Sequence, residues 1–261
     1  MEINKSSQNK SGIKDYLIKQ FYLIKSELLT LRLSWKWSLL IVLVSPISIL
    51  IFLYFLVGMK NPEYMNYVIS GNIIMSLVTG TMLTLGQELG VLKQIRGFDY
   101  YASLPIKKIQ LITAYLIRAT IVTLPSIMAL IFLGRIIFDV QININFTMFL
   151  IIFLSGLSLS GLGAFIGVYS TNMEQSSTVT QIIQPLIVYC APVFIPFESM
   201  PKIMQYISYL VPTTYVSNAL RKSFVGEFDL ISILVLLLFS IASVYLVEYK
   251  IDWRQNHNTV L

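Results

Sequence analysis

The chain has 261 residues and a formal net charge of +6; 56% of its residues are hydrophobic, and its mean hydropathy is +0.72. Soluble domains contain about 45–50% apolar residues, so this composition indicates a protein solvated largely by lipid. The longest polar stretch is the N-terminal arm, residues 1–36, which excludes a separate soluble catalytic domain and predicts one membrane domain over residues 1–261.

The N-terminal arm divides into two segments. Residues 1–12 are rich in Ser, Asn, Lys and Gln, which predicts disorder. In residues 13–36 apolar side chains recur every three or four positions: Ile13, Leu17, Phe21, Ile24, Leu28 and Leu31. This spacing predicts an amphipathic helix in the cytoplasmic membrane interface. The pattern fits both a helix that contacts a partner and a plain juxtamembrane helix.

Six apolar stretches follow, and most have the roughly 20 residues that a helix needs to cross a hydrocarbon core. They are Trp37–Val57, Tyr67–Gly86, Ile109–Ile137, Phe146–Ser170, Thr178–Pro196 and Leu230–Val247. The predicted fold class is therefore an all-α membrane protein with six transmembrane helices.

The connection between the second and third spans, residues 88–108, is the longest predicted cytoplasmic loop. Apolar residues at helical spacing in and beside it would form one face of a short helix: Leu89, Leu92, Ile95 and Tyr100. A helix of two or three turns is marginal alone in water, so it needs a surface to pack on. The segment is either a connector that rests on the bilayer or a docking helix for a soluble partner.

The second half of the chain has two marked features. Small residues follow one stripe of the fourth span and predict close helix packing: Gly156, Ser160, Gly163, Ala164 and Gly167. Residues 197–229 are too long for a tight turn and too apolar for a free loop. We expect two short helices there, before and after Pro212, which dip into the outer leaflet as re-entrant pieces.

Lysine and arginine are distributed unequally between the connections. Thirteen of them lie in the N-terminal arm, the loop after the second span and the tail, against five on the other side. The positive-inside rule then places both termini in the cytoplasm. The net positive charge reports this topology and contact with anionic lipid, and predicts no nucleic-acid partner.

The chain offers little for catalysis. His257 is the only histidine and Cys190 the only cysteine, which argues against Ser–His, thiolate and zinc chemistry. No phosphate-binding loop is present, so the chain is not expected to hydrolyse nucleotide itself. The predicted catalytic and metal sites are none.

Uncharged polar residues are the candidates to line a substrate route: Asn72, Gln181 and Gln184. The alternative for the two glutamines is hydrogen bonding between helices. Arg118, near the start of the third span, is interpreted as reaching back to the cytoplasmic headgroups.

Three stretches resemble the ABC-2 type permeases, the membrane subunits of type V ABC exporters. The first is Glu88-Leu-Gly90-Val-Leu-Lys93 with Leu104-Pro105, where Leu89 stands at the position that is usually Arg. The second is Gly161-Leu-Gly-Ala-Phe-Ile-Gly167 with Gln184-Pro185. The third is Pro196-Phe-Glu-Ser-Met-Pro201, Pro212-Thr-Thr-Tyr215 and Ala219-Leu-Arg221, which is most similar to the drug and antibiotic-resistance branch.

The resemblance implies a division of labour. Two permeases, as identical copies or as paralogues, would pair above two copies of an ATP-binding subunit, which binds ATP and magnesium, while this chain binds no cofactor. The coupling residues would be Glu88, Gly90, Leu92, Arg96 and Tyr100. The outer gate would be formed by Pro196, Pro201, Pro212 and Tyr215.

The expected function is export of a hydrophobic or amphiphilic substrate, such as a drug or an antimicrobial peptide, across the bacterial plasma membrane. Export of a lipid-linked polysaccharide or teichoic acid is the first alternative. A membrane scaffold or immunity protein without transport is the second.

Overall fold

The computed structural model describes residues 3–58, 64–138 and 140–250, and within these ranges the chain is helical without any β-strand. The predicted all-α fold is confirmed. The elements are α1 (Ile3–Leu53), η1 (Tyr54–Gly58), α2 (Met65–Leu77), η3 (Val78–Leu83), α3 (Thr84–Gln94), α4 (Gly97–Ala102), α5 (Lys108–Ile136), α6 (Phe146–Tyr169), α7 (Met173–Tyr189), η4 (Phe197–Ser199), α8 (Lys202–Ser208), α9 (Pro212–Val225) and α10 (Leu230–Lys250).

Four helices in the described ranges are long and apolar enough to cross a membrane: Met65–Gln94, Lys108–Ile136, Phe146–Tyr169 and Leu230–Tyr249. They correspond to the predicted second, third, fourth and sixth spans. The predicted first span lies on α1 and η1, where the described apolar stretch is the shorter Pro46–Leu56. The predicted fifth span corresponds to α7, which has 17 residues and ends before Pro192 and Pro196.

The second span is longer than the sequence analysis predicted. α2, the π-helical turn η3 and α3 form one continuous helix from Met65 to Gln94, which passes the predicted end at Gly86. No proline interrupts this stretch, and the helix ends only where Arg96 takes up a left-handed conformation with φ 55°. Glu88 and Gly90 therefore lie on the span itself, and not on a separate loop helix.

Glycines bring this long helix close to its neighbours. A Cβ atom built on Gly163 of α6 would lie 2.2 Å from the carbonyl oxygen of Met82, and one on Gly167 would lie 2.6 Å from that of Gly86. One on Gly90 would lie 2.6 Å from the Cβ of Ser176 on α7. The small residues of the fourth span thus serve packing within the chain.

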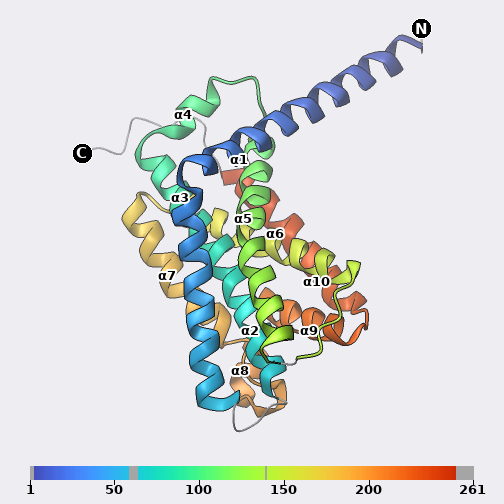
Figure 1. Ribbon diagram of the computed structural model, residues 1–261. Coiled ribbons are helices and arrows are strands. Elements are labelled where there is room, and N and C mark those ends of the chain that lie inside the picture. Colours follow the sequence, from blue (N-terminus) through green and yellow to red (C-terminus); the bar gives the residue numbers. More distant parts are fainter. Residues whose placement is uncertain (1–2, 59–63, 139, 251–261) are drawn as a thin grey trace.

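The two ends of the bundle carry different elements. Figure 1 shows α1 bending, so that its N-terminal part crosses one end of the bundle and its later part runs beside α5. The short helix α4 lies at the same end, and α8 and α9 lie at the opposite end. The predicted coupling segment, which includes α4, and the predicted gate segment, which includes α8 and α9, therefore occupy opposite ends.

Residues 1–12 were predicted to be disordered, and α1 begins within them, at Ile3.

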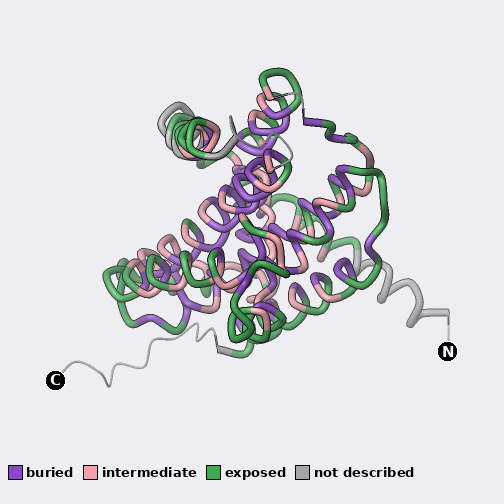
Figure 2. Tube along the Cα trace, turned by 90° about the horizontal axis from the view of Figure 1, so that it is seen from below, coloured by how far each residue is buried: buried purple, intermediate pink, exposed green. Residues whose placement is uncertain are grey.

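Buried residues gather inside the bundle, and exposed residues cover its outer faces (Figure 2). Many exposed side chains are large and apolar, among them Phe132, Phe146, Leu238 and Tyr245. Apolar surface of this extent marks a face that meets a membrane or a partner.

The segment before the last span forms the two predicted short helices. α8 precedes Pro212, and α9 begins at it, because proline fits the first turn of a helix, where no hydrogen-bonded N–H is needed. α9 ends at Gly226, whose φ of +88° suits a residue without a side chain.

Candidate functional site

The turn between α3 and α4 projects from the α4 end of the bundle. Ile95, Arg96 and Tyr100 are all exposed there, Ile95 and Tyr100 by about two thirds. Because these side chains are apolar, cationic and aromatic, they form a small surface of mixed chemistry, typical of a protein-binding patch.

The same turn is fixed from behind. Phe98 is 5% exposed and packs with Leu89, Leu111 and Tyr115. A Cβ atom on Gly97 would lie 2.5 Å from the Leu92 side chain, so the chain passes closely over α3. α4 is therefore a knob anchored from behind, whose outer face is exposed in the described part of the chain.

The five predicted coupling residues divide between the two sides of this knob. Arg96 and Tyr100 lie on its exposed face. Glu88, Gly90 and Leu92 lie on α3 below it, where Gly90 is buried against α7 and Leu92 packs under the turn. Of the five, Arg96 and Tyr100 are the most exposed, Glu88 and Leu92 are half-buried, and Gly90 is buried.

An ion cluster joins four elements behind the exposed face of the knob. The Arg118 guanidinium of α5 lies 2.5 Å from Glu88 Oε1 on α3 and 3.4 Å from Glu27 Oε2 on α1. The Tyr101 hydroxyl of α4 donates to Glu27 Oε1 at 3.0 Å. Burial raises the pKa of the Glu27 carboxyl, while Tyr101 and Arg118 oppose that rise. The cluster connects α1, α3, α4 and α5 through charge-assisted hydrogen bonds.

The ion cluster was not predicted from the sequence. Arg118 was expected to reach the lipid headgroups, but its side chain turns inward to two carboxylates. The available signal was a lone cation inside an apolar span together with acids on two other predicted helices. A buried charge in a membrane protein usually has such a partner.

Side-chain amides also join α1 to the start of α5. The Gln20 amide donates to Thr113 Oγ1 at 2.9 Å, and the Gln110 amide donates to the Tyr16 carbonyl at 3.0 Å. The N-terminal part of α1 is therefore held on the bundle by polar contacts, and its exposed Leu17 and Phe21 face outward.

The three predicted route residues lie in different surroundings. Asn72 is fully buried, and its amide donates to the Val68 carbonyl of its own helix at 2.9 Å. Gln184 of α7 donates to Thr79 Oγ1 of η3 at 2.7 Å, the helix-to-helix bond that was the alternative reading. Gln181 is exposed on α7 and bonds to Ser177 one turn earlier. The structure does not bring the three together.

The predicted gate residues belong to one hydrogen-bonded unit at the opposite end. Pro201 directly precedes α8, Pro212 begins α9, and Pro196 precedes the turn η4. The Tyr215 hydroxyl donates to the Tyr209 carbonyl at 2.9 Å. Thr213 and Thr214 at the start of α9 bond back to the Ile187 and Ser208 carbonyls, both at 2.6 Å. These bonds connect α9 to α7 and α8.

Arg221 has a structural role that the sequence motif did not reveal. Its guanidinium lies 4.1 Å from the ring centre of Tyr67 and donates to Ser70 Oγ and to the Pro192 and Val193 carbonyls. Burial lowers the pKa of Arg221 to about 10, which leaves it charged at neutral pH. It holds α9 against α2 and against the chain that follows α7.

In the described ranges, no group of three or more His, Cys, Asp or Glu side chains is placed to hold a metal ion.

The chain matches the sequence model of the family described as ABC-2 type transporter over residues 20–225, a range that includes the ion cluster and Arg221. A search of curated proteins found no match to the chain.

Proposed function

Because the chain belongs to the ABC-2 type transporter family and is the permease component of an ABC transporter, we propose that it exports a hydrophobic or amphiphilic substrate. Drugs and antimicrobial peptides are the substrate class that this proposal names. The substrate would cross the bacterial plasma membrane. The chain would have six spans, the four long helices together with α1 and α7, and both termini would lie in the cytoplasm. Within this topology, α8 and α9 are re-entrant helices of the outer leaflet.

The observation that carries the proposal is the knob at the α4 end. A subunit that binds ATP needs a rigid cytoplasmic element to push, and α4 has a buried anchor at Phe98 and a free face at Arg96 and Tyr100. ATP and magnesium would be held by that separate subunit, which ABC-2 permeases generally have as a partner.

Movement of the knob would pass inward through the ion cluster. Glu27, Glu88 and Arg118 link α1, α3 and α5, so a displacement of α4 would be shared by three helices. Glu88 and Leu92 would thus act in coupling through their positions inside the bundle.

Two ATP-binding subunits require two permeases, as identical copies or paralogues. We expect α7 to face the second permease, because side chains along this helix are exposed: Gln181, Ile182, Leu186 and Tyr189. A route between two such faces would be mostly apolar with a few amides, which suits an amphiphile better than an ion.

The test uses the chain coexpressed with a candidate ATP-binding subunit from the same genome. We expect Arg96→Glu with Tyr100→Ala to abolish copurification of that subunit and permease-dependent ATP hydrolysis, while the permease stays inserted. The matched control is Lys202→Glu with Tyr206→Ala on α8, an exposed cation and tyrosine on a short helix at the opposite end. Normal coupling in the α4 variant, or equal loss in the α8 control, would contradict the proposed docking face.

A further inference from the structure

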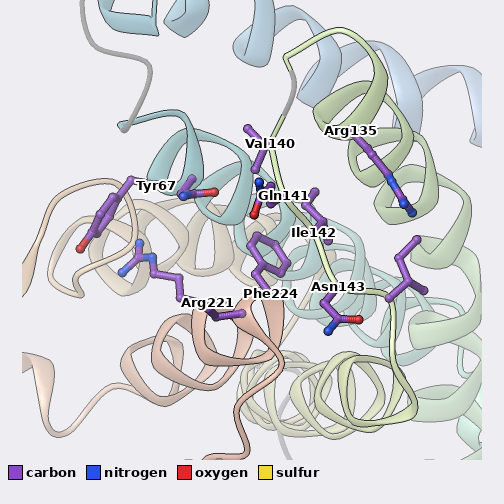
Figure 3. A pocket seen from close by; sticks show the side chains of 11 residues that line it. Tyr67, Arg135, Val140, Gln141, Ile142, Asn143, Arg221 and Phe224 are labelled. Atoms are coloured by element: carbon purple, nitrogen blue, oxygen red, sulfur yellow. The ribbon is translucent and has the colours of Figure 1, made fainter.

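An open cavity of about 940 Å³ lies at the α9 end of the bundle, and no predicted role accounts for it. Its walls come from the start of α2, the last turn of α5, the segment 140–144 and α9. Figure 3 shows Arg135 and Arg221 on opposite sides of the segment 140–144. That segment is held in place, because Val140 N–H donates to the Gly134 carbonyl and Asn143 N–H donates to the Phe224 carbonyl, both at 3.0 Å.

The described lining of the cavity carries positive charge. It contains Arg135 and Arg221 and no Asp or Glu. The donors of Arg221 are used on carbonyls and Ser70, so its charge contributes to the field but is not neutralised. Arg135 makes no hydrogen bond or ion pair with the described part of the chain. An anion is therefore the ligand that this lining favours.

Uncharged donors line the same cavity. The side chains of Asn66, Gln141 and Asn143 line the cavity and form no hydrogen bond with other described residues. A guanidinium with amides beside it offers several N–H groups to the oxygens of a phosphate.

A second, apolar groove of about 780 Å³ begins where the cavity ends. Met128, Phe132 and Ile136 line it along the outward face of α5. Arg135 and Ile144 belong to the linings of both the groove and the cavity. A ligand that fills both has an anionic head beside Arg135 and an apolar chain along α5.

The length of α5 sets the depth of this junction. The helix has 29 residues, from Lys108 to Ile136, with a lysine in its first turn and Arg135 in its last. At about 1.5 Å per residue it is about 43 Å long, close to the thickness of a bilayer with its headgroups. Arg135 therefore lies at headgroup level, with the groove in the acyl-chain region below it.

We propose that the cavity and groove together bind one anionic phospholipid, with its phosphate at Arg135 and one acyl chain between Met128 and Ile136. The proposed orientation of the chain makes this a site of the outer leaflet. Binding itself depends only on the junction of the two surfaces. A free phosphate would leave the groove empty, and a neutral amphiphile would leave the arginines without a counter-ion.

The experiment measures lipid binding to the purified full chain without any ATP-binding subunit, so that its outcome is independent of the proposed export activity. Native mass spectrometry would count phosphatidylglycerol and phosphatidylcholine bound from equal mixtures. We expect retained phosphatidylglycerol in the wild type and at least about tenfold weaker retention in Arg135→Gln, as the loss of a charge-assisted hydrogen bond predicts. Ala129→Phe, which fills the groove, should weaken retention similarly.

Two controls separate this site from general attraction. Lys202→Gln removes an exposed cation at the same end but outside the cavity, and Ile241→Phe enlarges an exposed apolar residue on α10. Both should retain the lipid as the wild type does. Equal retention of the two lipids, or unchanged retention in Arg135→Gln, would overturn the proposal. Displacement of the lipid by millimolar inorganic phosphate, with no effect of Ala129→Phe, would show a phosphate site instead and overturn it as well.

Discussion

At the scale of single residues, the charged side chains inside the bundle connect more helices than the uncharged polar residues that were predicted to line a route. Arg118 faces two carboxylates, and Glu27, its partner on α1, is only 4% exposed. Removing one member of a buried ion cluster leaves the others uncompensated, which costs more than the net stability of the cluster itself. Asn72 and Gln181, by contrast, bond within their own helices.

We expect Arg118→Met to lower the free energy of unfolding by about 3 kcal/mol, because Glu27 and Glu88 lose their shared cation. Denaturant unfolding of the detergent-solubilised chain measures this. Adding Glu27→Gln to the variant should restore part of the loss, since one buried carboxylate is then neutral. Lys202→Met is the control, and a similar deficit there would remove the role assigned to the cluster.

The same variant should be sensitive to pH. Burial raises the pKa of Glu27 above its ordinary 4.5, so its contribution to stability is full below the unfolded pKa and is lost as pH rises through the folded value. Arg118 opposes that rise, and its removal raises the folded pKa further. The deficit of Arg118→Met should therefore grow between about pH 5 and pH 8. A deficit that stays constant over this range would contradict the assignment.

At the scale of elements, the close contacts between helices depend on glycines. α6 approaches the second span at Gly163 and Gly167 so closely that backbone meets backbone. A side chain at either glycine would push the two helices apart, because the atoms that it would meet belong to the backbone and cannot rotate away as a side chain can.

We expect Gly163→Ala to destabilise the chain by about 1–3 kcal/mol, the usual cost of overpacking, because the new methyl group would meet the Met82 carbonyl. Thermal unfolding of the purified chain in detergent checks this. Ala242→Val, which enlarges an exposed residue of α10, should have little effect. Equal stability of the two variants would show that the seam is not closely packed.

The positions of α5, α6 and α10 could be predicted from the sequence, because each is an apolar stretch of about the length that crosses a membrane. The end of the second span was not predicted correctly. Glu88 is a charged residue, which is typical of a loop, but it lies on the helix because Arg118 is its counter-ion. The N-terminal helix shows a second limit. Leu17 and Phe21, on its apolar stripe, are exposed, while Gln20 and Glu27 contact the protein. In a membrane protein an apolar stripe can point away from the core, so periodicity locates the helix but not its packing face.

At the scale of the whole molecule, the two ends of the bundle carry different features. The end with α4 carries the exposed knob and the ion cluster, and the end with α9 carries the segment predicted to be the gate, Arg221 and the arginine-lined cavity. The match to the ABC-2 type transporter family extends over both ends.

We expect the α4 end to face the cytoplasm. In a Cys190→Ser background, which removes the only cysteine, Ser199→Cys should react with a membrane-impermeant thiol reagent in intact cells, and Tyr100→Cys should react only after lysis. Both positions are exposed, so access depends on the side of the membrane alone. Labelling of Tyr100→Cys in intact cells would reverse the proposed orientation.

The continuous helix from Met65 to Gln94 has a mechanical consequence. It is a rod of about 45 Å, and two of its closest helix contacts, Gly80 against Thr123 and Met82 against Gly163, lie near the middle of its length. A rod held near its midpoint pivots there, so any tilt about that point moves its two tips in opposite directions. A push that carries the Gln94 tip toward the bundle axis thus carries the Met65 tip away from it.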